Sequence, residues 1–291
     1  MKSDLRGVIA ATITPVDEAG EPDLGALVQH VRWLLDTGCD GINLLGTTGE
    51  ATSFGIDQRL RVMRAIAESD LPMSRFMVGT GTSALADTVA LTEAAGALGF
   101  AGALVLPPFY YKNVADHGMI AYIEALAANT QIPIYLYNFP ALSGVTYSPA
   151  LVAKLIENFG TRIAGLKDSS GNLDYAAEIA ALSPDLAVFP SNEASLDRAR
   201  TGEFAGCISA TANLNSRYCA AALHSGDTGV LSRAVRIRQM LSDVPLVPAV
   251  KALVGSIHGQ PGMARTMPPL VAIERGLSGK LASSYRELAP E

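Results

Sequence analysis

The chain has 291 residues, of which 49% are apolar and 17% are charged, a composition that indicates a folded globular protein rather than a disordered one. The formal net charge is −6 at pH 7, whereas nucleic-acid-binding domains usually carry a basic excess, so we expect no nucleic-acid partner. The three cysteines and four histidines are scattered along the chain, and we expect neither a disulfide framework, a metal site nor a cofactor.

The N-terminal residues lack the apolar core of a signal peptide. No run of about 18 apolar residues, the length that spans a membrane, occurs anywhere in the sequence. Unpaired cysteines fit a reducing compartment. We therefore expect a cytoplasmic protein that does not associate with membranes.

Eight short apolar runs recur along the chain, and each is nearly continuous instead of alternating with polar residues. Strands that are buried on both faces have this pattern, and they belong to parallel sheets. The predicted strands are residues 7–14, 41–45, 75–79, 101–106, 133–137, 163–167, 186–189 and 206–210.

Stretches with helical spacing lie between the predicted strands. Residues 24–36 place apolar side chains at the spacing of one helix face, and Ser83 is positioned to cap a helix over 84–98 that Gly99 ends. Further helices are predicted over 151–158 and 173–182. Strands and helices that alternate eight times predict an α/β protein of the (β/α)8 TIM barrel class. An open doubly wound sheet would often carry a glycine-rich dinucleotide turn, which is absent here.

The residues after the last predicted strand read as additional C-terminal helices. They are predicted over 216–224, 228–241, 247–257 and 270–276. We expect residues 1–225 to form the barrel and residues 226–291 to form a helical extension packed on it. Such an extension could cover one face of the barrel or contribute to an oligomer contact.

Polar side chains follow several predicted strands, at the end of a barrel where active sites are built. Lys167 ends a buried strand, where loss of solvation favours a neutral amine that can attack a carbonyl. The alternative is a rim lysine paired with Asp168. Tyr137 ends the preceding strand, close enough to transfer protons to such a lysine. A core tyrosine bonded to the backbone is the alternative there.

The loop after the second predicted strand is the third chemical element. It reads Gly46-Thr47-Thr48-Gly49-Glu50, and its two glycines allow a tight turn that presents backbone N–H groups. Together with the threonine hydroxyls, these groups could bind a carboxylate beside a reacting ketone. The alternative is an ordinary loop in which a threonine caps the next helix.

These elements resemble the dihydrodipicolinate synthase / N-acetylneuraminate lyase family of class I aldolases over nearly the whole chain. The family pattern is met at four places: Gly46-Thr47-Thr48-Gly49-Glu50, Tyr137-Asn138-x-Pro140, Gly165-x-Lys167-Asp168 and Ile208-Ser209-x-Thr211-Ala212-Asn213. The resemblance implies an enzyme that makes or breaks a C–C bond to C3 of pyruvate without a metal. It also implies pyruvate and an aldehyde as substrates, and a homotetramer built as a dimer of dimers.

The resemblance implies a role for each matching residue. Lys167 would form the Schiff base with pyruvate, and Tyr137 would relay protons, with Thr47 and Tyr110 extending the relay. Tyr110 often lies near a subunit interface in this family. The pyruvate site would be formed by Gly46, Thr48 and Ile208, with Thr48 on the carboxylate and Ile208 contributing a backbone group.

The second substrate is less defined, and Leu142 and Glu193 are the candidate residues for it. The synthases usually have an arginine where this chain has Leu142, and that arginine holds the carboxylate of the aldehyde. The string from Tyr137 to Gly144 is closer to the N-acetylneuraminate lyases, whereas residues 208–213 are closer to the synthases. Residues 190–193 do not clearly match the sugar-binding pattern of the lyases.

The leading hypothesis is therefore a lyase similar to N-acetylneuraminate lyase, acting on a 2-keto-3-deoxy acid or a sialic-acid-like substrate. The alternatives are a 4-hydroxy-tetrahydrodipicolinate synthase and a Schiff-base dehydratase or decarboxylase. A third alternative is a metal-dependent barrel enzyme that uses Asp168, Glu50 or Glu193 to bind Mg²⁺. A fourth is a non-catalytic protein that binds a keto acid.

Overall fold

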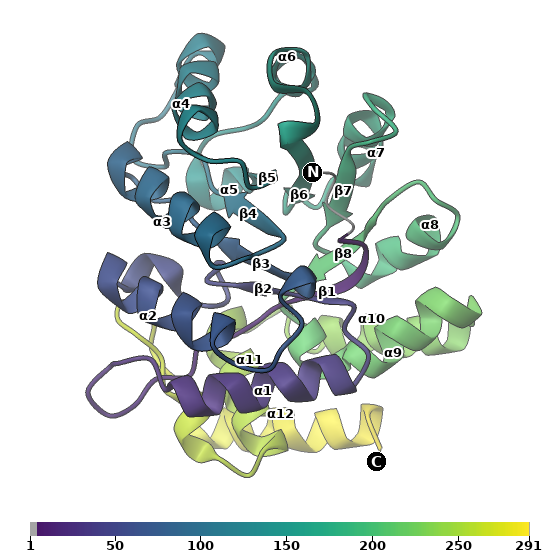
Figure 1. Cartoon of the computed structure of the whole chain (residues 1–291). Helices are drawn as coiled ribbons and strands as arrows, with labels where there is room; N and C mark the ends of the chain where they lie inside the picture. The colour runs from purple at the N-terminus through teal and green to yellow at the C-terminus, as the bar shows by residue number, and fades with distance from the viewer. Residues whose placement is uncertain (1–4, 291) are drawn as a thin grey trace.

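Eight parallel strands form the centre of the computed structural model, which describes residues 5–290 (Figure 1). The strands are β1 (Gly7–Ala11), β2 (Gly41–Leu44), β3 (Phe76–Gly79), β4 (Gly102–Val105), β5 (Ile134–Asn138), β6 (Ile163–Asp168), β7 (Ala187–Pro190) and β8 (Gly206–Ser209). They pair in the order β7-β6-β5-β4-β3-β2-β1-β8, and every residue in them is buried. The barrel closes between β7 and β8, where the backbone N–H of Ala205, just before β8, donates to Val188 O of β7 at 2.9 Å. The predicted TIM barrel is confirmed.

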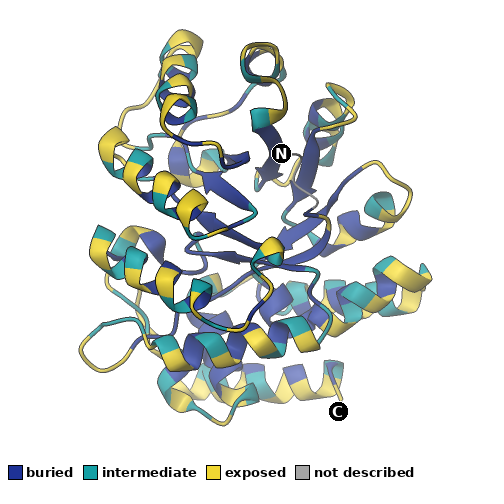
Figure 2. Ribbon diagram, in the orientation of Figure 1, coloured by how far each residue is buried: buried dark blue, intermediate teal, exposed yellow. Residues whose placement is uncertain are grey.

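Helices surround the strands, and most of them turn a buried face inward and an exposed face outward (Figure 2). The helices up to the last strand are α1 (Leu24–Asp36), α2 (Ile56–Ala67), α3 (Leu85–Ala97), α4 (Asp116–Asn129), α5 (Pro140–Ser143), α6 (Pro149–Phe159), α7 (Leu173–Ala181) and α8 (Leu196–Arg200). The apolar spacing that predicted a helix over 24–36 gives the bounds of α1, where Asp23 caps the start by accepting from Ala26 N at 3.0 Å.

The start of α3 differs from the prediction. Ser83 is not its cap, because Ala84 occupies that position and no side chain caps the helix. The neighbouring Thr82 stabilises the turn before the helix instead, since its backbone N–H donates a hydrogen bond to Thr88 Oγ1 at 3.0 Å. The predicted end is confirmed: Gly99 has a φ of +80°, a conformation that glycine adopts without strain.

The C-terminal part consists of α9 (Ala212–Ser225), α10 (Thr228–Gln239), α11 (Leu246–Ile257) and α12 (Arg275–Leu288). Helix α9 begins one turn earlier than predicted. The prediction of a helix over 270–276 is wrong, because the chain is not helical in this segment until α12 begins at Arg275. Pro268 and Pro269 stand just upstream, and proline supplies no N–H for a helical turn and disfavours helical geometry in the preceding residue.

Two apolar clusters show how the barrel interior is filled and how the C-terminal helices are attached to the barrel. The barrel interior is filled by side chains from its own strands, among them Ile9, Met77, Leu104, Tyr135, Phe189 and Ile208. A second cluster joins α10, α11 and α12 to Ile13, which follows β1, and to Leu214 of α9. Because this cluster includes barrel residues, we propose that the extension predicted over residues 226–291 packs on the barrel through residues 226–290, with the boundary near residue 225; residue 291 lies outside the described residues.

Candidate active site

Lys167 and Tyr137 meet at the carboxyl ends of two neighbouring strands. They are paired residues in the register of β5 and β6, so their side chains emerge at the same height. Lys167 is only 4% exposed, and its Nζ donates to the Tyr137 hydroxyl at 3.0 Å. Asp168 does not take part, since its carboxylate accepts from Asn138 Nδ2 at 2.7 Å and from Ser170. Lys167 is therefore not a rim lysine paired with Asp168, and Tyr137 is not a core tyrosine whose hydroxyl is bonded to the backbone.

The hydroxyl of Tyr137 is also bonded to Thr47, which follows β2. The Thr47 Oγ1 lies 3.2 Å from the phenolic oxygen, so three polar groups form a continuous chain. Burial would raise the pKa of Tyr137, but the adjacent Lys167 charge and hydrogen bonds with Thr47, Lys167 and Ser169 outweigh it, and the pKa is lowered. A phenol with a lowered pKa gives up its proton more readily, as a proton relay requires.

These groups line a cavity of about 510 Å³ at the carboxyl end of the barrel. The predicted residues Thr47, Thr48, Tyr137, Lys167, Ile208 and Leu142 all belong to its wall. Thr48 and Ile208 are buried, whereas Leu142 in α5 is 60% exposed at the surface of the cavity. This volume falls within the range of small-molecule sites.

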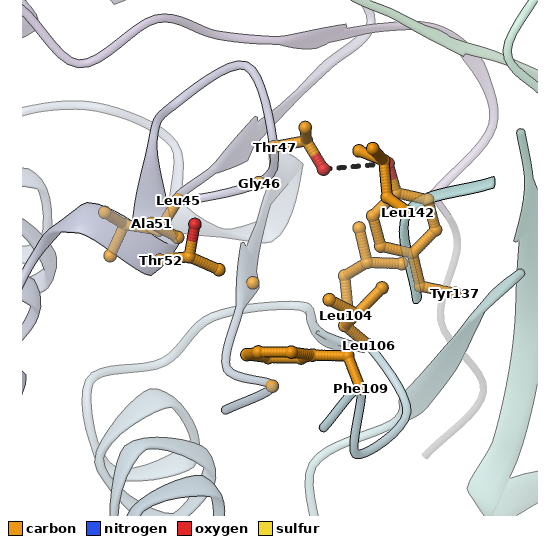
Figure 3. Close-up of a pocket in the computed structure, with 12 residues that line it drawn as sticks. Leu45, Gly46, Thr47, Ala51, Thr52, Leu104, Leu106, Phe109, Tyr137 and Leu142 are labelled. Atoms are coloured by element: carbon orange, nitrogen blue, oxygen red, sulfur yellow. Dashed lines mark hydrogen bonds between the residues drawn. The ribbon is translucent and has the colours of Figure 1, made fainter. Parts of the chain in front are cut away.

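A smaller apolar hollow of about 270 Å³ adjoins the cavity and shares Thr47, Thr52, Tyr137 and Leu142 with it. Figure 3 shows the bond between Thr47 and Tyr137 on one side of this hollow, with Leu106 and Phe109 on another. Gly46 lines this hollow and not the larger cavity.

The loop of residues 46–50 is held by a buried ion pair. Glu50 has a positive φ of 53°, and its carboxylate contacts Lys251 Nζ of α11; neither side chain is exposed. Glu50 also accepts from Met267 N at 2.7 Å, and Lys251 donates to Thr14 O at 3.0 Å. The short helix that follows the loop has no side-chain cap. The loop is therefore fixed by the C-terminal extension, and neither threonine serves as a helix cap.

The sequence also matches known proteins. Residues 4–258 match the profile of the dihydrodipicolinate synthetase family. The chain belongs to this family. Its members are class I lyases that act through a Schiff base, and this chain is a lyase of that class.

Three relatives illustrate the similarity to the dihydrodipicolinate synthetase family. A DapA-like lyase of Chloroflexus aurantiacus is 33% identical over 98% of this chain and 97% of its own. The dihydrodipicolinate synthase of Agrobacterium tumefaciens superposes with a TM-score of 0.90 at 31% identity, covering 97% and 99% of the two chains. YagE of Escherichia coli, solved in complex with pyruvate, gives a TM-score of 0.88 at 26% identity, covering 97% and 98%.

Two predicted site residues of this family member lie elsewhere. Tyr110 is 76% exposed, and its ring packs edge-on against Tyr111 at 5.4 Å, so it does not reach Thr47 within the chain. Glu193 is fully buried outside the cavity, contrary to expectation. Its carboxylate accepts from Ser209 Oγ at 2.7 Å, from Thr211 and from Asn215, so it supports the end of β8.

Several cavity residues escaped the sequence prediction, and Ser169 and Arg238 are two that carry polar groups. Ser169 directly follows β6, and its position two residues after Lys167 was a usable signal. Arg238 lies on α10, and nothing in the local sequence distinguished it from Arg233 or Arg236 on the same helix.

Among residues 5–290, no group of three or more His, Cys, Asp or Glu side chains is arranged to hold a metal ion. Each of the three carboxylates considered for Mg²⁺ has its own partners. Glu50 contacts Lys251, Asp168 contacts Asn138, and Glu193 contacts Ser209. In the same described range, no helix is both long and apolar enough to cross a bilayer.

Proposed function

We propose that this lyase makes or cleaves a C–C bond to C3 of pyruvate, with Lys167 as the Schiff-base residue. The observation that carries the proposal is the 3.0 Å contact between the buried Lys167 Nζ and the Tyr137 hydroxyl in the cavity wall. An amine that attacks a keto acid needs a neighbour that supplies and removes protons, and a phenol at hydrogen-bond distance is such a neighbour.

The reaction uses these residues in sequence. Lys167 Nζ attacks C2 of pyruvate, and the carbinolamine loses water as Tyr137 donates a proton to the departing hydroxyl. Loss of a proton from C3 gives an enamine, whose carbon attacks the carbonyl carbon of an aldehyde. The aldehyde oxygen takes up a proton and becomes a hydroxyl. Hydrolysis by water then releases a 4-hydroxy-2-keto acid and regenerates the amine, and cleavage is the reverse.

The pyruvate carboxylate is assigned to the loop of residues 46–50. Thr48 lines the cavity next to Thr47, and the backbone of Gly46 turns beside them. Ile208 approaches the same cavity from β8 and supplies a backbone group. Hydroxyl and backbone N–H groups are suitable partners for a carboxylate.

The identity of the second substrate follows from the compound that the enzyme makes or cleaves. We infer that this compound is a 2-keto-3-deoxy acid, as for a lyase similar to N-acetylneuraminate lyase. Leu142 supports this, because an exposed leucine on the cavity wall cannot hold the carboxylate that the synthases grip there. A 4-hydroxy-tetrahydrodipicolinate synthase is the second candidate, favoured by the similarity to the Agrobacterium synthase. A dehydratase or decarboxylase would share the same Schiff base.

We also propose a cytoplasmic homotetramer in which Tyr110 acts across an interface. The rings of Tyr110 and Tyr111 are both exposed, and an apolar hollow lies open beside Thr47. An aromatic ring from a second copy fits a hollow with leucine and phenylalanine walls, and its hydroxyl would extend the relay from Thr47.

The test of the proposed function needs no knowledge of the aldehyde. In deuterated water, the enzyme should exchange the methyl protons of pyruvate through the enamine, seen as loss of the methyl proton NMR signal. Lys167→Met should abolish this exchange while it preserves the fold, because the two side chains have similar length. A folded wild-type protein that leaves the signal unchanged would refute the proposed function.

A further inference from the structure

Arg238 is a second cation in the wall of the cavity that contains Lys167. It lies on α10, beyond the end of β8, and its side chain is 32% exposed. Arginine is suited to carboxylates and phosphates, since its planar fork of N–H donors matches their paired oxygens.

The guanidinium of Arg238 is only loosely engaged by the protein. Among the described residues, its hydrogen bonds come from Nη1 alone, to Glu193 Oε2 at 3.3 Å and to Ser209 Oγ at 3.4 Å. Both distances exceed the usual range for such bonds. Glu193 does not depend on this contact alone, because its other oxygen accepts from three donors: Ser209, Thr211 and Asn215. Donors on Arg238 are therefore available to a ligand.

The charges around the cavity favour an anion. Three of its lining residues are charged: Glu50, Lys167 and Arg238. Glu50 is buried and matched by Lys251, which leaves the two cations facing the cavity. In the proposed reaction, Lys167 becomes covalently bound to pyruvate, and the pyruvate carboxylate is assigned to the loop of residues 46–50. Arg238 is then left for a second anionic group.

We propose that Arg238 binds an anionic group, a carboxylate or a phosphate, on the aldehyde that reacts with pyruvate. The inference rests on the proposed function and specifies its substrate class. The anion would enter from the β8 and α10 side of the cavity, whereas Leu142 occupies the β5 side. The reacting carbonyl then faces Lys167 and Tyr137, and the C–C bond forms between C3 of the enamine and the aldehyde carbon. Arg238 orients the substrate and takes no part in proton transfer.

The test compares matched aldehydes that differ in charge. Succinic semialdehyde is paired with butanal, and glyceraldehyde 3-phosphate is paired with glyceraldehyde, each with pyruvate as co-substrate. The wild type should prefer the anionic member of at least one pair, and which pair shows the preference distinguishes a carboxylate from a phosphate. Arg238→Met should raise the KM for that aldehyde by about 10- to 100-fold, the effect of losing a charged hydrogen bond. The KM for the neutral member should stay unchanged.

Two controls separate ligand binding from a structural role. Arg236→Met removes an exposed arginine of the same helix and should leave the preference intact. Glu193→Gln, combined with Arg238→Met, should not restore the preference. If Arg238 served only to balance the Glu193 charge, neutralising Glu193 would rescue the variant and overturn the inference.

The methyl exchange of pyruvate separates this inference from the proposed function. The wild type is assayed for exchange of the pyruvate methyl protons, a reaction in which no aldehyde takes part. If the wild type exchanges them but shows no preference for either anionic aldehyde, or converts none of the four, the inference about Arg238 fails while the Schiff-base function stands. If the wild type does not exchange them, the proposed function itself fails.

Discussion

At the scale of single residues, Tyr137 depends on groups from two other parts of the barrel, the ends of β2 and β6. Lys167 comes from β6, Thr47 follows β2 and Ser169 follows β6, and together they lower the pKa of the phenol although it is buried. The charge of Lys167 and the three hydrogen bonds all favour the phenolate. Removal of one hydrogen bond should therefore move the pKa of Tyr137 back upward.

Thr47→Val tests this dependence, because it removes the bond to Tyr137 and keeps the size of the side chain. The pKa of Tyr137 should rise, so the alkaline limb of the pH–rate profile for pyruvate methyl exchange should move to higher pH. Tyr137→Phe should slow exchange by about 100- to 10,000-fold and lose that limb. Thr52→Val, at another cavity threonine, should leave the limb in place. An unchanged limb in Thr47→Val would show that Tyr137 does not determine it.

The pairing of Lys167 with Tyr137 could be predicted from the sequence, because both end buried strands and adjacent parallel strands place such residues at equal height. Tyr110 and Glu193 could not be placed in the same way. Tyr110 is in a loop whose course depends on what packs against it, and Glu193 is held by β8 and α10, which come later in the chain. Long-range contacts of this kind leave no local pattern.

At the scale of elements, one buried group joins three helices and a strand. His30 of α1 lies 3.0 Å from His258, the residue after α11, and 2.9 Å from Asn213 Oδ1 of α9. Asn213 in turn donates to Ala11 O at the end of β1 at 2.8 Å. Burial lowers the pKa of His30 to about 4, although the hydrogen bond that its ring donates to Asn213 opposes the shift, and the nearby His258 adds to the lowering.

The pKa of His30 predicts a loss of stability in acid. Below its ordinary pKa of 6.5, His30 binds a proton in the unfolded chain but not in the folded one, so stability present above pH 6.5 is lost as the pH falls toward about 4. The loss across this range is about 3 kcal/mol. In urea unfolding at several pH values, His30→Gln should flatten the dependence, whereas His117→Gln, at an exposed histidine, should not. An equally steep dependence in His30→Gln would contradict the assignment.

Strand positions could be predicted because burial on both faces gives each one a continuous apolar run. Helix ends were less predictable. Ser83 has the side-chain chemistry of a helix cap, but the turn before α3 is already stabilised by a hydrogen bond of Thr82. Residues 270–276 have the apolar residues of a helix, but the prolines just before them restrict the backbone and prevent a helix from starting there. Local propensity gives way to packing at such boundaries.

At the scale of the whole molecule, the exposed aromatic pair Tyr110 and Tyr111 bears on assembly. Tyr110→Ala should shift the protein to a smaller species in light-scattering chromatography, because it removes apolar area from the proposed interface. It should also slow pyruvate methyl exchange, because the relay from Thr47 loses its extension. Leu182→Ala, at an exposed leucine on the outer side of the barrel, should change neither. Unchanged assembly and rate in Tyr110→Ala would contradict the interface.

The barrel topology could be predicted from the alternation of strands and helices, since parallel strands joined by helices have few ways to connect. The role of the C-terminal extension could not. Lys251 lies more than 200 residues from Glu50 in the sequence, yet their buried ion pair fixes the loop beside the active site. Likewise, only the folded chain brings Arg238 of α10 to the cavity of Lys167.

The central claim is covalent chemistry at Lys167, and reduction with sodium borohydride in the presence of pyruvate tests it most directly. Intact-mass analysis should show a single reduced pyruvate adduct, peptide mapping should place it on Lys167, and Lys167→Ala should not form it. A folded wild-type protein without an adduct, or with the adduct on another lysine, would contradict the claim.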